Sequence, residues 1–213
     1  MTVLRTRDLS LREVHDLFRF QRQYSNSFLP LLNFEDVTLA EQQELIQIQT
    51  YFDYYLTEGE TSEGQVKLVA ISPLLKLAGY YQPPIQIKVE DAIAKIDIKD
   101  DDTTITGRLD LLAINRSKPI GTHTFLWILL IETKKGLADP LAGLPQLLTY
   151  AHKGLANQKP VWGLTTNGVR YQFVYIQAGD SPIYQLMPTL NLFESEDAAQ
   201  LLQVLKSILQ GSI

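Results

Sequence analysis

The sequence predicts a globular domain of the α/β (α+β) class, in which helices flank a central mixed β-sheet. Three observations favour this class. Amphipathic helical patterns open and close the chain, the middle of the chain is rich in β-branched residues, and the run FLWILLI at 125–131 is apolar at every position. A strand that is apolar throughout is typical of a sheet covered on both faces, so helices should pack above and below it.

Composition and length narrow the class of protein further. The chain has 213 residues, of which 45% are hydrophobic and 20% charged, as expected of a globular protein with one good core. Its longest apolar run, at 125–131, is far shorter than the roughly 20 residues that span a bilayer. The N-terminus has no signal-peptide pattern, and there is no cysteine. We therefore expect no membrane contact and a cytoplasmic location.

Helical signals dominate the N-terminal third of the chain. Two capping-box patterns, at 10–13 and 38–41, predict helix starts. The second precedes apolar residues at helical spacing, which predict a helix from about 39 to 56. After a polar break, helical spacing resumes over 63–77, where Pro73 predicts a kink or a boundary.

Sequence patterns typical of strands begin at residue 85. Asn167-Gly168, between two such patterns, is the strongest hairpin signal in the chain. The helix that follows the third strand has two proline start signals, Pro140 and Pro145. The predicted elements are strands within 85–100, 103–115 and 125–135, a helix within 140–156, a hairpin within 160–177, a shorter strand at 183–190 and a helix over 195–209.

A carboxylate and a lysine close the apolar third strand. Strand side chains alternate between faces, so Glu132 and Lys134 point the same way, and Asp110 lies beside Glu132 if the second and third strands pair. Two carboxylates in a low-dielectric setting repel each other unless a cation lies between them, and Mg²⁺ prefers such oxygen ligands. We therefore expect Mg²⁺, or Mn²⁺ in its place, on Asp110, Glu132 and the backbone carbonyl of Thr133, with Lys134 alongside.

Two residues of the next helix extend this candidate site. Gln146 and Tyr150 are four positions apart and share one helix face. An amide and a phenol on a helix that faces the sheet suit hydrogen bonding to a polar ligand such as a phosphate backbone or a base. Lys135, at the end of the third strand, is either a solvated flank of the site or a candidate for contact with a phosphate.

Three segments in this order resemble a known family. GRLD at 107–110, IETK at 131–134 and QLLTY at 146–150 are similar to the three-part signature of the PD-(D/E)XK (restriction endonuclease-like) nucleases, with Leu109 in place of the usual proline. The stretches SEGQVKLVAISPLLKLAGYY and GLTTNGVRYQFVYI resemble the N-terminal nuclease domain of type I restriction enzyme R subunits. The resemblance covers roughly residues 61–177.

The resemblance implies a restriction endonuclease-like core over 61–213, with residues 1–60 as an N-terminal helical extension packed on it. It implies Mg²⁺-dependent hydrolysis of DNA phosphodiesters, as an endonuclease or exonuclease of restriction or repair type. The chain has no G-x-x-x-x-G-K-[ST] motif, so a nuclease domain without a helicase motor is expected. The implied catalytic residues are Asp110, Glu132, Lys134 and Glu63, and the implied substrate-binding residues are Gln146, Tyr150 and Lys135.

Each piece also has an ordinary structural explanation. An E-x-K sequence at a strand end is commonly a solvated terminus, a lone strand Asp makes local hydrogen bonds, and Glu63 suits the start of a helix without any catalysis. The alternative function is therefore a non-catalytic nucleic-acid-binding or assembly module that keeps the nuclease scaffold. The aromatic residues of the N-terminal extension would then dock a second copy of the chain or a restriction-modification or repair partner; they are Tyr51, Phe52, Tyr54 and Tyr55.

The net charge of −5 argues against general phosphate binding, so a local basic patch is needed for DNA. Basic residues do cluster in the sequence near the proposed site, and they predict modest, sequence-nonspecific and salt-sensitive DNA binding. They are Lys134, Lys135, Lys153, Lys159 and Arg170, with Arg116 and Lys118 in the expected loop before the third strand.

Overall fold

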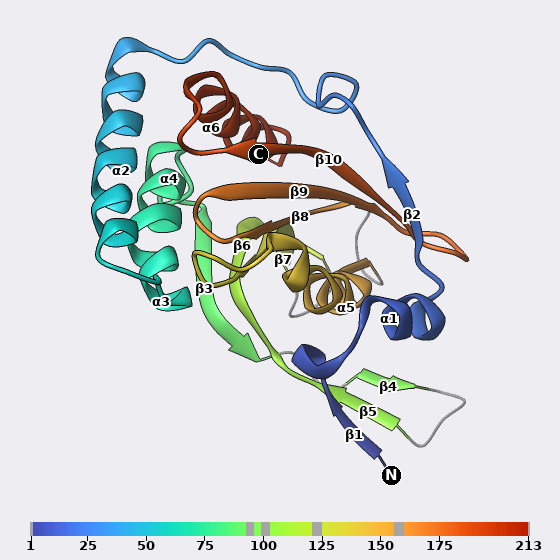
Figure 1. The fold of residues 1–213 in the computed structure, drawn as a ribbon. Helices are drawn as coiled ribbons and strands as arrows, with labels where there is room; N and C mark the ends of the chain where they lie inside the picture. The colour runs from blue at the N-terminus through green and yellow to red at the C-terminus, as the bar shows by residue number, and fades with distance from the viewer. Residues whose placement is uncertain (1, 93–95, 99–102, 121–124, 156–159, 213) are drawn as a thin grey trace.

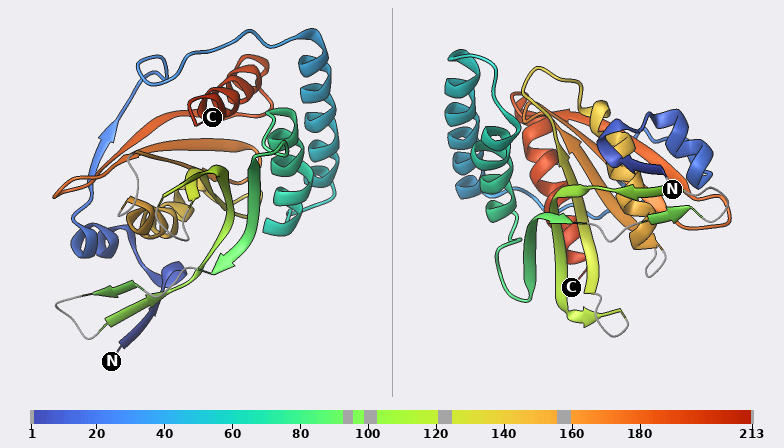
Figure 2. Two further views of the ribbon diagram at one scale, coloured as in Figure 1. Left: turned by 180° about the vertical axis from the view of Figure 1, so that it is seen from behind. Right: turned by 90° about the horizontal axis from the view of Figure 1, so that it is seen from below.

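A seven-stranded mixed sheet lies between two layers of helices in the computed structural model (Figures 1 and 2). The structure describes residues 2–92, 96–98, 103–120, 125–155 and 160–212. The order of strands in the sheet is β2-β10-β9-β8-β7-β6-β3. The predicted α+β class, with a mixed sheet flanked by helices, is therefore confirmed.

The central strands are antiparallel to their neighbours, except that β7 is parallel to β8, and β2 at the edge is parallel to β10. The parallel β7–β8 pair follows from the helical crossover between them. The strands are β2 (Gln21–Tyr24), β3 (Ile85–Ala92), β6 (Arg108–Pro119), β7 (Phe125–Thr133), β8 (Val161–Thr166), β9 (Arg170–Gln177) and β10 (Ile183–Asn191). A separate three-stranded sheet, in the order β1-β5-β4, consists of β1 (Thr2–Arg5), β4 (Ile96–Ile98) and β5 (Thr103–Thr106).

Helices cover both faces of the large sheet. One face packs against α1 (Leu11–Phe18) and α5 (Leu144–Leu155), and α5 follows the short 3₁₀ turn η3 (Pro140–Gly143). A further 3₁₀ turn, η1 (Thr6–Asp8), leads into this layer. The helices of the other face are α2 (Leu39–Thr57), the helix formed by α3, η2 and α4, and α6 (Ser195–Gln210). Figure 2 shows the two layers on opposite sides of the strands.

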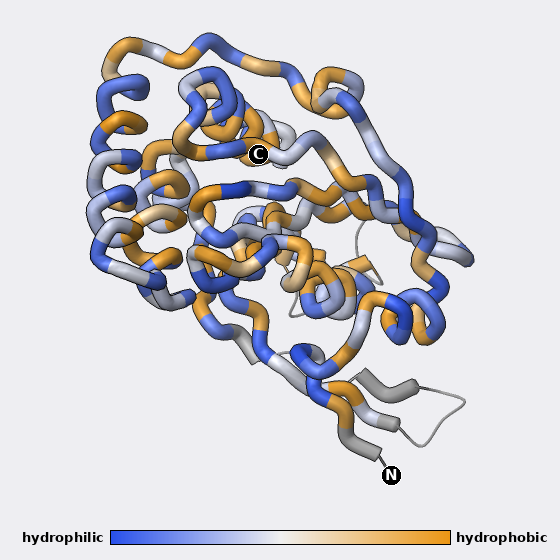
Figure 3. Tube along the Cα trace, in the orientation of Figure 1, coloured by the Kyte–Doolittle hydropathy of each residue, from blue (hydrophilic) through white to orange (hydrophobic). Residues whose placement is uncertain are grey.

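Strand β7 lies at the centre of this arrangement, between β6 and β8. Its residues from Ile128 to Ile131 are each at most 1% exposed, so the predicted burial on both faces is confirmed. Apolar positions run through the strands and recur along the helices (Figure 3). Among the described helices, none combines the length and apolarity that a membrane crossing requires.

The helical segment at 63–77 is one continuous helix with a widened middle. It consists of α3 (Glu63–Gln65), the π-helical η2 (Val66–Ile71) and α4 (Ser72–Leu77). Pro73 has no amide hydrogen, so it cannot donate to the carbonyl four residues earlier. The amide of the preceding residue, Ser72, donates to the carbonyl of Lys67, five residues back, which is the hydrogen-bond pattern of a π-helix. The kink or boundary predicted at Pro73 is therefore a π-helical turn inside a helix that continues to Leu77.

The N-terminal 60 residues are not purely helical, which corrects the expected helical extension. The predicted capping boxes do start α1 and α2. Strand β2, however, adds an edge to the large sheet, and β1 joins the small sheet. All four residues of β2 are exposed, so the sequence carries no alternation to reveal it. Both cores include residues from this region, such as Phe52 in one and Phe18 in the other.

Candidate carboxylate–lysine site

The candidate site forms where β6 begins and β7 ends. The two strands are antiparallel, with Leu112 opposite Leu130 and Leu111 opposite Ile131. Continuing this register by one residue brings Asp110 opposite Glu132. Cross-strand neighbours point to the same side of a sheet, so the two carboxylates share one side at the end of the pair.

Asp110 is held by three hydrogen bonds that use both of its oxygens. The backbone amide and the hydroxyl of Thr133 donate to Oδ2, at 2.8 and 2.6 Å. The ammonium of Lys67 donates to Oδ1 at 3.1 Å. Thr133 therefore orients Asp110 through its amide and side chain, while the expected use of its carbonyl as a metal ligand stays a prediction.

Glu132 is the buried acid of the site, with 2% of its surface exposed. The ammonium of Lys134 donates to its Oε1 at 3.0 Å, whereas its Oε2 is buried and has no hydrogen-bond partner. Burial, which is the largest cause, and the negative charge of Asp110 together raise the pKa of Glu132 to about 8, although the Lys134 ammonium acts in the opposite direction. Glu132 therefore holds a proton or a cation at neutral pH.

Lys134 joins Glu132 to the helix on the other side of the cluster. Its Nζ lies 3.9 Å from Oε1 of Glu63, whose side chain is 47% exposed in the first turn of α3. Ser62 caps this helix start, where its hydroxyl accepts a hydrogen bond from the Gln65 amide. The four residues predicted to be catalytic, Glu63, Asp110, Glu132 and Lys134, thus lie in one cluster.

The backbone of η3 approaches the Glu132 side chain closely. A Cβ atom at Gly143 of η3 would lie 2.9 Å from Cγ of Glu132 and 3.3 Å from Cε of Lys134, so only glycine fits there without displacement. On the neighbouring strand β8, Thr165 is opposite Glu132, and its hydroxyl is also buried without a partner. Two buried oxygens that lack partners therefore occupy adjacent strands, as expected beside a site for a cation or water.

Gln146 and Tyr150 both hold the start of β6. The Tyr150 hydroxyl donates to the Arg108 carbonyl and lies 3.2 Å from Oγ1 of Thr6. The Gln146 amide donates to the same carbonyl at 3.1 Å and to the Tyr150 hydroxyl at 3.4 Å. Tyr150 is fully buried, and burial raises its pKa to about 12, so it is a neutral donor. These contacts fix the backbone two residues before Asp110, and direct substrate contact by this pair stays a prediction.

Two further residues complete the cluster, and sequence reasoning missed both. Lys67 of η2 binds Asp110, and its Nζ also lies 3.6 Å from Oε1 of Glu90 in β3. The i, i+4 spacing from Glu63 to Lys67 would have placed them on one helix face, but it says nothing about Asp110. Four carboxylates and two ammonium groups give the cluster a formal charge of −2 when all are ionised.

The expected basic surroundings are only partly present. Lys135 is 60% exposed and pairs with Glu60 at 3.7 Å. Arg116 and Lys118 continue along β6 away from Asp110, roughly 20 and 26 Å distant at the usual strand rise, so their predicted place near the site is wrong. They were assigned to a loop because the sequence did not show that β6 extends to Pro119. Lys159 lies outside the described residues.

The donor set determines which metal site is feasible. In the described part of the chain, no three Asp, Glu, His or Cys side chains are grouped closely enough to enclose a metal ion. Mg²⁺ needs only one or two carboxylates because it keeps several of its waters. The buried Oε2 of Glu132, which lacks a partner, fits this open kind of coordination next to Asp110.

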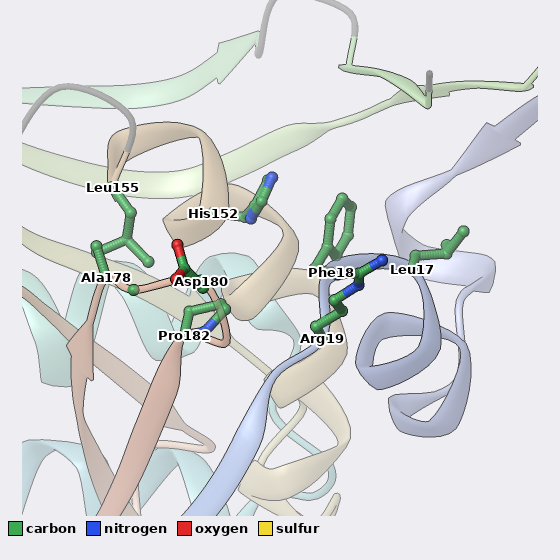
Figure 4. A pocket seen from close by; sticks show the side chains of 9 residues that line it. Leu17, Phe18, Arg19, His152, Leu155, Ala178, Asp180 and Pro182 are labelled. Carbon is green, nitrogen blue, oxygen red and sulfur yellow. The ribbon is translucent and has the colours of Figure 1, made fainter. Parts of the chain in front are cut away.

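A second hollow lies at the opposite ends of the strands (Figure 4). It has a volume of about 360 Å³ and lies between the C-terminal ends of α1 and α5 and the turn from β9 to β10. The His152 ring stacks on Phe18 there, with 4.4 Å between ring centroids, and burial lowers its pKa. Arg19 and Asp180 flank the opening.

The fold and the cluster define an α+β protein with paired carboxylates and lysines at the end of a central strand pair. No family model matches this chain, and no curated protein matches it.

Proposed function

We propose that this protein hydrolyses DNA phosphodiesters with the aid of Mg²⁺, as a nuclease of the PD-(D/E)XK type. The observation that carries the proposal is Glu132, which is buried beside Asp110 and Lys134 and has one oxygen without a partner. A protein gains nothing in stability from such an acid, since burying a carboxylate that lacks a full set of partners is unfavourable. Perturbed groups of this kind are typical of functional sites.

Asp110 and Glu132 would hold the metal ion, with Thr133 fixing the rotamer of Asp110 through its amide and hydroxyl. Bound Mg²⁺ supplies a Lewis acid for a phosphoryl oxygen and makes a bound water more acidic. Lys134 places an ammonium next to Glu132, where it can stabilise negative charge on the phosphate in the transition state. Glu63, on the outer side, holds that ammonium in place.

The charge of the cluster predicts how DNA binds. Even with Glu132 protonated, the metal-free cluster has more carboxylates than ammonium groups and repels phosphates, so DNA binding by the isolated chain should depend on Mg²⁺ or Mn²⁺. The exposed Lys135 and the half-buried Gln146 lie at the rim of the site and are the proposed substrate contacts. With few basic residues nearby, binding is modest and sequence-nonspecific, and it weakens as salt rises.

The direct test is cleavage of plasmid and linear DNA in Mg²⁺ or Mn²⁺. Lys134→Ala and Asp110→Ala should lower the cleavage rate by about 10²–10³-fold or more, because Lys134 would stabilise charge in the transition state and Asp110 would hold the metal ion. Lys76→Ala is the matched control, since Lys76 is an exposed lysine of α4 outside the cluster. Equal cleavage by all the variants would show that a contaminant or another site is responsible.

One observation favours a second candidate, a non-catalytic assembly module. On α2, Tyr51 and Tyr54 are 56% and 63% exposed and Tyr55 is 38% exposed, whereas Phe52 is buried and cannot contribute to such a surface. Tyr51 also lines a groove of about 500 Å³ between α2 and α4. A clean dimer in sedimentation that Tyr54→Ser converts to monomer, with no heat of divalent-ion binding, would favour this candidate over the nuclease.

A further inference from the structure

We propose that the ammonium of Lys67 fills a second cation position, between Asp110 and Glu90, so that the candidate site takes one divalent ion rather than two. The inference rests on the proposed Mg²⁺ site, because Asp110 belongs to both positions. It adds Lys67 and Glu90 to the site and states how many metal ions the site binds.

Three acids form a row across three neighbouring strands. In the β3–β6 register Val89 is opposite Leu111, so Glu90 is opposite Asp110. The β6–β7 register in turn brings Asp110 opposite Glu132. Asp110 is therefore the central carboxylate, with one gap on its Glu132 side and one on its Glu90 side.

The gap on the Glu90 side already holds a cation. Nζ of Lys67 lies 3.1 Å from Oδ1 of Asp110 and 3.6 Å from Oε1 of Glu90, and the Lys67 side chain is only 18% exposed. An ammonium group that bridges two carboxylates takes the position that a bridging metal ion would take, with one positive charge in place of two. This position is full in the folded protein.

The gap on the Glu132 side is different. Of the two carboxylate oxygens of Glu132, Lys134 contacts only Oε1, and Oε2 is buried without a hydrogen-bond partner. This oxygen is independent of the ion pairs made by Lys67, and it can still accept a cation. The two sides of Asp110 therefore differ: Lys67 bridges the carboxylates on one side, and an oxygen without a partner remains on the other.

The backbone around the filled position is specialised on both sides. Lys67 comes from the π-helical turn η2, an element that is frequent at functional sites. Glu90 has φ of +51°, a left-handed conformation that is uncommon for residues other than glycine and turns the chain within β3. Two unusual local conformations thus meet at one ion pair, as expected where the position of a charge is specified.

The test is the number of Mn²⁺ ions bound by the full chain, measured by titration calorimetry and by electron paramagnetic resonance of free Mn²⁺. The intact protein should bind one ion. Lys67→Ala should bind two, because it opens the position between Asp110 and Glu90, and Lys67→Ala combined with Glu90→Gln should return to one. Lys76→Ala is the control for removal of a lysine from the same helix, and it should bind one ion.

Two ions on the intact protein, or one ion on a folded Lys67→Ala variant, would overturn the inference. Circular dichroism checks folding, and Lys67→Met, which keeps an apolar chain of similar length, replaces the alanine variant if that variant does not fold. If the intact protein binds no Mn²⁺, the proposed nuclease site fails. In that case one Glu90-dependent ion on Lys67→Ala still supports the occupied position, and no ion on it refutes the position.

Discussion

The two ends of the central strands differ in the kind of ionisable group that each holds and in how well that group is satisfied. The hollow of Figure 4 has a clear volume, but its ionisable group, the half-buried His152, stacks on Phe18, and its lowered pKa favours the neutral ring. At the other end, Glu132 is buried next to a second acid and lacks a partner for one oxygen. We therefore place the proposed chemistry at Glu132, because an unsatisfied buried carboxyl group is a stronger indication of a functional site than the volume of a cavity.

The largest expected effect contrasts one aspartate from each end. Asp110→Asn should reduce Mg²⁺-dependent DNA cleavage by about 10²–10³-fold or more, because an amide binds Mg²⁺ poorly and cannot balance Lys67. Asp180→Asn, in the exposed rim of the hollow, should leave the rate unchanged. Initial rates of plasmid nicking measure both. Similar losses in the two variants would remove the distinction between the ends.

The second effect is on stability as a function of pH. The folded pKa of Glu132 is raised to about 8 from its ordinary value near 4.5, so the folded state keeps a proton that the unfolded state releases. Without metal, the free energy of unfolding should fall by on the order of a few kcal/mol as pH rises from about 4.5 to 8. Urea denaturation across this range measures it. Glu132→Gln should flatten the profile, as should saturating Mg²⁺; an unchanged slope in Glu132→Gln would assign the effect to another group.

A smaller effect concerns the support behind Asp110. Tyr150→Phe removes a buried hydroxyl that donates to Arg108, and it should lower the free energy of unfolding by about 1–2 kcal/mol. It should also weaken Mn²⁺ binding, because Arg108 lies two residues before Asp110 on the same strand. Tyr54→Phe, an exposed tyrosine of α2, is the matched control. A Tyr150→Phe variant with normal Mn²⁺ affinity would show that this support serves folding alone.

The smallest expected effect concerns His152, at the end of the strands that holds the hollow of Figure 4. Its contribution to stability changes with pH in the opposite direction to that of Glu132. Burial lowers the pKa of His152 below its ordinary value of 6.5, so the unfolded state takes up a proton first as pH falls. This contribution to stability is present above about pH 6.5 and is lost below it, by roughly 1 kcal/mol or less. His152→Gln should remove it without altering cleavage. Denaturation at pH 7 and pH 5 makes the comparison, and a cleavage defect in this variant would link the hollow to catalysis.

The sequence was sufficient for the parts of the site that depend on local periodicity. Alternation along β7 puts Glu132 and Lys134 together, and the pairing of β6 with β7 adds Asp110. Lys67 and Glu90 could not be predicted in the same way, since they meet Asp110 only through a π-helical turn and the register of a third strand. No local pattern encodes either of these.

The same distinction applies to the fold. The helices with capping boxes and the Asn167-Gly168 hairpin follow from short-range signals, and the structure confirms them. The polar strand β2 has no such signal, because it forms only when β10 offers an edge to pair with. Its pairing is long-range, and single-sequence patterns do not contain it.

That edge strand has a consequence for the behaviour of the protein in solution. Strand β2 covers one border of the large sheet with four exposed residues, among them Arg22. If the first 24 residues were removed, β10 would become an exposed edge strand with unpaired backbone amides and carbonyls. Exposed edge strands of this kind pair with strands of other molecules. A shortened form should therefore self-associate and precipitate at concentrations where the full chain stays dispersed.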